Sequence, residues 1–277
     1  MTLLVRSRTP GDDGVSVEVT PESAGWNYVG FRLERLGAGT RRTFHEADRE
    51  TCLVFVTGTG HVSAGAACFN GLGGRATPFD GAPTAVYLPS GVVCEIEAVT
   101  DIELAICTAP AETTREVRLI APEDSLLEAR GRGSNTRYVR NILSDASDIS
   151  ERLLVVEVIT PGGHWSSYPP HKHELDSWPQ ETALEETYYH RLKPPGGFAV
   201  QRVYTDDRSL DVTMTVEDGD VVMVPRGYHP VGVPHGYDLY YLNVMAGPIK
   251  AWKFTNDPSH AWIIELGSCA SNGPATV

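Results

Sequence analysis

Short apolar runs, separated by turn-forming residues, recur along the whole chain. The runs are rich in β-branched and aromatic residues, and each is bounded by Gly, Pro, Asp or Asn, which is typical of strands that end in tight turns. They lie at residues 52–56, 85–88, 153–159, 221–224 and 239–245. No long stretch has its apolar residues at the 3.6-residue period of a helix, and only residues 125–130 suit a short helix. The pattern therefore predicts a predominantly β protein.

A proline-glycine turn followed by an apolar strand occurs once in each half of the chain. The prolines that bound the two copies are 21 residues apart in the first half and 23 in the second; they are Pro89 and Pro110, then Pro225 and Pro248. Such internal similarity predicts two copies of one β unit. The chain has 277 residues, which is enough for two units that each bury a core. We expect the first unit at residues 1–125 and the second at 136–277, joined by a polar stretch.

Acidic side chains outnumber basic ones by 36 to 23, which gives a formal net charge of −13. A protein that binds nucleic acid or a membrane surface through phosphates needs a basic surface. We therefore expect neither partner, and a bound anion has to be held by a few local arginines. The N-terminal sequence lacks the features of a signal peptide, and no run reaches the roughly 18 apolar residues of a membrane span, so we expect a cytoplasmic protein.

Five cysteines are spread through the sequence without forming a CxxC pair. They are Cys52, Cys68, Cys94, Cys107 and Cys269. Because their surroundings are apolar and their number is odd, we interpret them as reduced core residues rather than as disulfides or zinc ligands.

Residues suited to binding a metal are concentrated in the second half. His171 and His173 are two positions apart, so on an extended strand their side chains project from the same face. Glu185 or Glu186 on the next strand can add a carboxylate, and His229 follows a proline-glycine turn further along. A mixture of imidazole and carboxylate suits a divalent metal. His235 is a minor rival for the last position. The corresponding place in the first half has only His45, Glu46 and Asp48, which predicts a metal-free first unit.

Longer segments around the metal motif in the second half resemble known proteins. The HxH pair, the later glutamate and the Gly-x5-Pro-x-Gly segment that precedes His229 resemble the cupin superfamily. More specific are residues 169–173, 184–190, 197–210, 218–230 and 236–248, which resemble the 5-deoxy-glucuronate isomerases, a family of bicupin enzymes of inositol catabolism. The resemblance is strongest over residues 160–262, while the first half fits more loosely. It implies an all-β protein of two tandem jelly-roll-like cupin barrels, of which the first is degenerate and the second binds the metal and is catalytic.

The family resemblance also implies an activity and a ligand set. The reaction is the conversion of the aldose 5-deoxy-D-glucuronate to the ketose 2-deoxy-5-keto-D-gluconate. One divalent ion per chain, zinc or manganese, is expected on His171, His173, Glu186 and His229, with Glu186 favoured over Glu185 because it opens its strand as the ligand glutamate does in related sugar isomerases. Such a reaction needs stabilisation of an enediolate and a group that moves a proton between C2 and C1.

Candidates for the remaining roles come from their positions near the metal motif. Four residues could move the proton: Tyr204, Asp206, His190 and the ligand Glu186. Four could bind the uronate: Arg202, Arg226, Tyr188 and Tyr228. Arg202, Tyr204 and Asp206 alternate along one strand, so we expect them to line the barrel together, although an ion pair is the alternative for Arg202. Lys172 lies between the two histidines and is expected to point away from the metal. The arginines at 130, 132, 137 and 140 are interpreted as linker or subunit contacts rather than as an RNA site.

Other functions with the same site are a related uronate ketol-isomerase of the 4-deoxy-5-hexosulose-uronate type and a cupin dioxygenase. A non-catalytic sugar-binding or regulatory bicupin is disfavoured because no DNA-binding helix pair accompanies the barrels. The expected partners are a small anionic sugar and further copies of the chain. Exposed sheet edges and a metal-free unit favour a homodimer or larger homo-oligomer.

Overall fold

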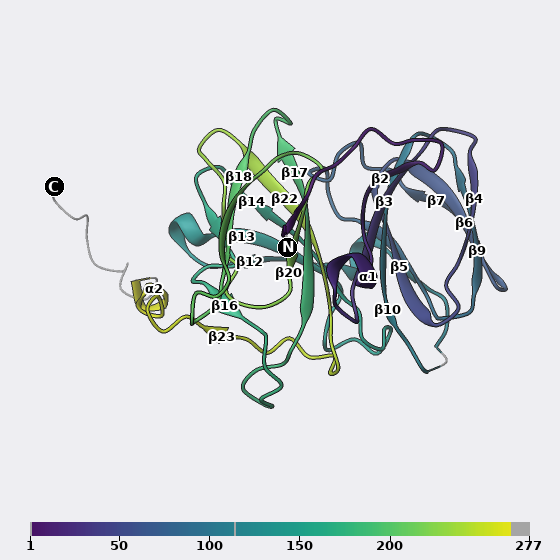
Figure 1. Cartoon of the computed structure of the whole chain (residues 1–277). Coiled ribbons are helices and arrows are strands. Elements are labelled where there is room, and N and C mark those ends of the chain that lie inside the picture. The colour runs from purple at the N-terminus through teal and green to yellow at the C-terminus, as the bar shows by residue number, and fades with distance from the viewer. Residues whose placement is uncertain (1, 114, 267–277) are drawn as a thin grey trace.

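The computed structural model describes residues 2–113 and 115–266. Two β units lie side by side, the first half of the chain in purple and blue and the second in green and yellow (Figure 1). All five strands predicted from apolar runs are present: β5 (Arg49–Thr57), β8 (Thr84–Leu88), β14 (Leu154–Thr160), β20 (Val221–Val224) and β22 (Asp238–Ala246). Among the described residues no helix is long and apolar enough to cross a membrane.

The first unit consists of a larger and a smaller sheet. The larger sheet has the order β11-β8-β5-β10-β3-β2 and the smaller one β4-β9-β6-β7. The additional strands are β2 (Val15–Val19), β3 (Gly30–Leu36), β4 (Arg41–His45), β6 (Thr59–Ala64), β7 (Ala67–Gly73), β9 (Val93–Ala98), β10 (Ile102–Pro110) and β11 (Arg118–Ile120). A single turn of helix, α1 (Pro21–Ala24), precedes β3.

The second unit repeats this plan. Its larger sheet has the order β1-β20-β17-β22-β14-β13-β12, its smaller one β15-β21-β18-β19, and β16 pairs with β23. The additional strands are β1 (Leu4–Val5), β12 (Leu127–Arg130), β13 (Arg137–Leu143), β15 (Trp165–Ser166), β16 (His171–Lys172), β17 (Glu185–Lys193), β18 (Ala199–Tyr204), β19 (Asp211–Val216), β21 (Val231–Gly232) and β23 (Thr255–Asn256). The short helices are η1 (Pro122–Asp124), η2 (Gly133–Asn135) and α2 (Trp262–Leu266).

The central strands of the larger sheets are buried on both faces. In β22, Tyr240 and Leu242 belong to a cluster that also contains residues of the first unit, whereas Leu239 and Tyr241 belong to the core inside the second unit. Strand β5 behaves in the same way, with Val54 facing the other unit. Strands buried on both faces have continuous apolar sequences, which is why these two runs are so distinct. The molecule thus has a core within each unit and a third core between the units.

Buried carboxylates add polar contacts between the halves. Glu50 of the first unit accepts hydrogen bonds from the consecutive backbone N–H groups of Glu151, Arg152 and Leu153, at 2.7 to 2.8 Å. Arg75 forms a 2.9 Å ion pair with Glu157 of β14, and both side chains are almost fully buried. The two units therefore share satisfied polar groups as well as an apolar core.

Three expectations need correction. Residues 125–130 do not form a helix: β12 pairs with the edge of β13, with Leu127 opposite Arg140, and this backbone pairing outweighs the weak local pattern. Strand β1 pairs with β20, so the first residues of the chain join the second sheet and not the predicted first unit, residues 1–125. Cys68 is exposed, unlike Cys52, Cys94 and Cys107, and Cys269 lies outside the described residues.

Candidate metal centre

Three histidines from two separate segments of the second unit meet inside it. His171 belongs to β16, His173 follows that strand, and His229 lies between β20 and β21. All three are buried, and their ligand atoms lie within 4.8 Å of one another. A backbone contact closes the insertion at residues 175–183. The N–H of Leu184 donates to the carbonyl of His173 at 3.0 Å, so the chain lies beside His173 again where β17 begins.

Each histidine ring is oriented by a backbone carbonyl. Nδ1 of His173 lies 3.1 Å from the oxygen of Leu184, and Nδ1 of His229 lies 2.8 Å from the oxygen of Gly227. His171 is bonded to the carbonyl of Pro169. A carbonyl can only accept, so these ring nitrogens carry the hydrogen, and Nε2 of the neutral His229 ring presents a lone pair. Metal-binding histidines are commonly held in this way.

Glu186 completes a set of donors. Its Oε2 lies 3.0 Å from Nε2 of His173 and 3.2 Å from Nε2 of His229. Nε2 of His229 is buried and has no hydrogen-bond partner among the described residues. Two ring nitrogens therefore face one carboxylate, and Nε2 of His229 presents a lone pair to it, so a cation between these groups would be stabilised. Metal–ligand bonds of about 2.0–2.2 Å put neighbouring donors roughly 3 to 3.5 Å apart, so the spacing fits a single divalent ion.

Glu186 and His229 have the charge states of ligands, whereas at His173 burial opposes protonation but Glu186 outweighs it and raises the pKa. Burial opposes ionisation of Glu186, but His229 and His173 outweigh it and hold the pKa of the carboxyl below its usual value. Burial lowers the pKa of His229 to about 4, so this imidazole is neutral at pH 7. A deprotonated carboxylate and neutral imidazoles are the forms that bind metals. The buried group therefore suggests a divalent metal site.

The rival ligands lie elsewhere. Glu185 points to the opposite face of β17, where its carboxylate accepts the backbone N–H groups of Asn27, Tyr28 and Val29 of the first unit at 2.6 to 3.0 Å. His235 is exposed in the turn before β22. Alternation of side chains along an extended strand separates the two neighbouring glutamates.

Two of the other predicted residues face the interior with Glu186. The hydroxyl of Tyr188 lies 2.9 Å from Oγ of Ser167, and burial together with Glu186 raises the pKa of Tyr188 far above its usual range. His190 is fully buried, with Nε2 3.0 Å from Oε1 of Gln201, and burial lowers its pKa to about 4. Nδ1 of His190 has no hydrogen-bond partner among residues 2–113 and 115–266.

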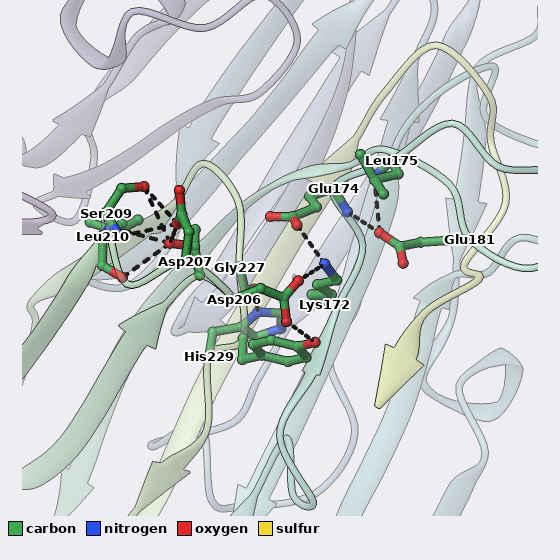
Figure 2. A network of polar contacts seen from close by, with 12 residues as sticks. Lys172, Glu174, Leu175, Glu181, Asp206, Asp207, Ser209, Leu210, Gly227 and His229 are labelled. Atoms are coloured by element: carbon green, nitrogen blue, oxygen red, sulfur yellow. Dashed lines mark hydrogen bonds and ion pairs between the residues drawn. The ribbon is translucent and has the colours of Figure 1, made fainter. Parts of the chain in front are cut away.

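Tyr228 and Asp206 belong to a separate network with Lys172. The hydroxyl of Tyr228 donates to Asp206 at 2.9 Å, and the ammonium of Lys172 lies between Asp206 and Glu174 (Figure 2). Lys172 thus turns away from the histidines that flank it. The carboxylate of Asp206 is largely exposed and already paired, which leaves it little basicity.

Tyr204, Arg202 and Arg226 do not gather around the histidines. The hydroxyl of Tyr204 donates to Asp257 at 2.8 Å. Arg202 forms a bidentate ion pair with Asp211 at 2.7 and 2.8 Å, and Arg226 is exposed. The expected common face of β18 is wrong in its direction, because Gln201 and Val203 point into the barrel and Arg202 points out. Alternation along a strand shows which residues share a face, but it does not show which of the two faces packs against the core.

Arg137, which the sequence indicated as a linker or subunit contact, is a further cation of the second unit. It opens β13, two residues before Val139, whose side chain belongs to the core of the second unit. Its guanidinium interacts electrostatically with Tyr188, Tyr241 and His171. The sequence contained one signal for this position: Arg137 is two residues before the apolar Val139, and residues two apart on a strand share a face.

Known proteins resemble this chain over nearly its whole length. A model of the KduI/IolB family matches residues 3–263. The chain is 51% identical to the 5-deoxy-glucuronate isomerase of Geobacillus kaustophilus (strain HTA426) over 264 residues, which cover 95% of each chain. It is 51% identical to the enzyme of the same name from Bacillus subtilis (strain 168) over 249 residues, which cover 90% of this chain and 92% of the relative.

Solved structures extend the comparison. The crystal structure of an IolB-like protein from Salmonella typhimurium matches with a TM-score of 0.92 and 49% identity, over 95% of this chain and 99% of that one. An oxalate decarboxylase from Lactobacillus farciminis matches with a TM-score of 0.64 and 15% identity, over 92% of this chain and 88% of that one. The second likeness shows the fold alone, and it confirms the predicted all-β cupin architecture. Because the family model and the half-identical relatives both span nearly the whole sequence, this chain belongs to the KduI/IolB family.

Proposed function

We propose that this protein is an aldose-ketose isomerase that converts 5-deoxy-D-glucuronate to 2-deoxy-5-keto-D-gluconate in inositol catabolism. The names of the half-identical relatives support the reaction. The observation that carries the proposal is the buried cluster in which the carboxylate of Glu186 lies 3.0 Å from Nε2 of His173 and 3.2 Å from Nε2 of His229. Such a cluster can hold a divalent metal ion, which can contact the C1 and C2 oxygens of a sugar.

His171, His173, His229 and Glu186 would hold one divalent ion. When bound, such an ion acts as a Lewis acid that stabilises negative charge on the C1 and C2 oxygens during proton transfer. The protein fixes the rings of the three histidines through backbone carbonyls, so little rearrangement is needed when the ligands bind. Zinc and manganese both suit this donor set, and we expect the bound ion to be one of the two.

Tyr188 is suited to contact a substrate oxygen as a donor. Its pKa lies far above the usual range, so the hydroxyl stays protonated at neutral pH and can donate a hydrogen bond to an oxygen that gains charge. For the proton transfer itself, Glu186 and His190 are the better-supported candidates, because both are buried on the interior face of β17. Tyr204 and Asp206 have less support, because their polar atoms are already paired with Asp257 and with Lys172.

The expected assembly and location are part of the same proposal. A homo-oligomer is supported by the exposed edge strands at the ends of the sheets, such as β12 and β19, which offer unpaired backbone groups. A cytoplasmic location is supported by the metabolic activity of the named relatives.

The test is metal analysis coupled to an isomerase assay on 5-deoxy-D-glucuronate, run without oxygen. We expect the purified protein to contain about one divalent ion per chain and to turn over anaerobically. His229→Ala removes a proposed ligand and should lose both the metal and the activity. His235→Ala is the matched control, because this exposed histidine follows only six positions later and should keep both.

Two outcomes count against the proposal. A His229→Ala protein with full metal content and turnover would show that the ligand assignment is wrong. A requirement for oxygen would indicate oxidative chemistry in place of isomerisation, since an aldose-ketose conversion moves hydrogen within one molecule and consumes no oxidant.

A further inference from the structure

We propose that Arg137 binds the carboxylate of the substrate and thereby makes the site specific for uronates. The inference rests on the proposed isomerase function and deepens it. It concerns the end of the substrate opposite to the carbonyl that reacts, and it assigns a role to a residue outside the predicted site.

Strand β13 directs Arg137 into the second unit. Along this strand Tyr138 is exposed, whereas Val139 is buried in the core that also contains Tyr188 and Tyr241. Arg137 and Val139 are two positions apart and so share a face. Arg140, on the other face, lies 3.7 Å from Glu157, which pairs with the first unit.

The guanidinium of Arg137 is half-buried and weakly satisfied. Its described hydrogen bonds both come from Nη1 and are long, 3.3 Å to the carbonyl of Asn135 and 3.4 Å to that of Tyr168. No carboxylate among residues 2–113 and 115–266 forms an ion pair with it. A cation that gives up water without gaining an anion is costly, and a bound carboxylate would remove that cost.

A glycine makes room for this side chain. Gly131 has a positive φ of 77°, and a Cβ at this position would lie 2.8 Å from Nη1 of Arg137 and 2.1 Å from the carbonyl oxygen of Asn135. Any other residue would therefore displace the guanidinium or the backbone beside it. The turn before β13 thus keeps a defined space around Arg137.

One continuous segment connects Arg137 to the histidine cluster. From residue 166 onwards, Oγ of Ser166 lies 2.6 Å from the hydroxyl of Tyr241, Oγ of Ser167 lies 2.9 Å from that of Tyr188, and the carbonyl of Tyr168 accepts from Arg137. Three residues later the segment supplies His171. The segment that contacts Arg137 and supplies His171 thus also carries or contacts four hydroxyl groups, which suit a polyhydroxylated chain with an acid at one end.

The alternative cations are already neutralised or lie outside. Arg202 is paired with Asp211 on the outer face of β18, and Lys172 is paired with two carboxylates. Arg226 is exposed in the turn after β20. A guanidinium can bind both oxygens of a carboxylate at once, and it remains charged even though burial lowers the pKa of Arg137.

The experiment compares a uronate with its neutral counterpart. Metal-loaded wild type, Arg137→Gln and Arg137→Lys are assayed on 5-deoxy-D-glucuronate and on 5-deoxy-D-glucose, which has a hydroxymethyl group in place of the carboxylate. We expect Arg137→Gln to lower kcat/KM for the uronate by about 100-fold while the value for the neutral sugar stays nearly unchanged. Arg137→Lys should recover part of the loss, because it restores the charge without the planar fork. Arg202→Gln is the matched control and should leave the preference for the uronate intact.

Metal content and binding measurements separate the possible failures. Arg137→Gln should retain the metal, and calorimetric titration with D-glucuronate, a hexuronate, should show binding to wild type that the variant loses. Equal losses on both sugars would mean that Arg137 is only structural and would overturn the inference. If wild type binds D-glucuronate through Arg137 but does not isomerise 5-deoxy-D-glucuronate, the isomerase proposal fails while the carboxylate site stands. If wild type binds neither uronate, the carboxylate site is wrong.

Discussion

Glu185 and Glu186 are consecutive residues of β17 whose carboxylates lie on opposite faces of one sheet. Glu186 lies 3.0 Å from His173 inside the second unit, whereas Glu185 accepts three backbone N–H groups of the first unit. The strand that would supply the metal ligand is therefore also fixed by the contact between the units. A shift of β17 by one residue would exchange the two carboxylates and disrupt both contacts.

Substitution of these two glutamates should separate metal binding from stability. Glu186→Gln should lower metal affinity by at least about 100-fold, since even residues that only orient metal ligands contribute 10- to 100-fold. Glu185→Gln should keep the metal but lower the free energy of unfolding by about 1–3 kcal/mol, because hydrogen bonds to a charged acceptor are replaced. Metal titration and urea unfolding measure the two effects. Loss of metal in Glu185→Gln with retention in Glu186→Gln would reverse the assignment.

Removal of the metal should destabilise the folded protein. A ligand that binds only the folded state adds about 4 kcal/mol when its free concentration is 1,000 times its Kd. Treatment with a chelator should therefore lower the Tm of wild type, and addition of zinc or manganese should restore it. His229→Ala should already melt at the lower temperature and should not respond to the chelator. An unchanged Tm of wild type after verified metal removal would contradict this prediction.

His190 should make stability depend on pH. Its pKa is lowered to about 4 in the folded state, so between the usual value near 6.5 and pH 4 only the unfolded chain binds the proton. Stability is then lost as the pH falls through this window, by about 1.4 kcal/mol per pH unit. At pH 5, wild type should have lost about 2 kcal/mol more than His190→Gln, relative to pH 7.5. Urea unfolding at both pH values, at matched metal content, tests this, and equal losses would refute it.

The buried ion pair between the units should be sensitive to loss of one partner. Glu157→Gln leaves Arg75 buried without its counter-charge, which should cost about 3–5 kcal/mol of unfolding free energy. Glu97→Gln removes the partner of Arg41 in an exposed pair and should cost less than about 1 kcal/mol. Denaturant unfolding of the two variants gives the comparison. Similar costs would mean that the interface relaxes to hydrate Arg75.

The fold could be predicted where local pattern and burial agree. Strands β5 and β22 are buried on both faces, so their sequences are continuous apolar runs that need no knowledge of the partner strand. Strand β1 has two residues and β12 has four, mostly exposed, and each is defined by the strand it pairs with. Such pairings depend on distant parts of the chain, which a local pattern does not contain.

The same limit applies to the candidate site. The spacing of His171 and His173 fixes their common face, His229 was predicted from its place after a proline-glycine turn, and the family resemblance favoured Glu186 over Glu185. Arg202 was expected inside because it alternates with Tyr204, but the alternation alone does not tell which face is inside. Arg137 was interpreted as a linker or subunit contact because it lies at the junction of the two predicted units. It precedes His171 by 34 residues, and the return of the segment near Tyr168 brings that segment to it.

The pairing of β1 with β20 affects how the chain can be made. Leu4 lies opposite Val222, so β1 is synthesised long before the strand with which it pairs. Until β20 has been synthesised, the first unit can assemble around its own strands while β1 remains unpaired. In that interval β1 could pair with a strand of another protein. The second barrel can reach its complete sheet only late in translation, and a nascent chain stalled before Val222 should be a better target for chaperones than one stalled after it.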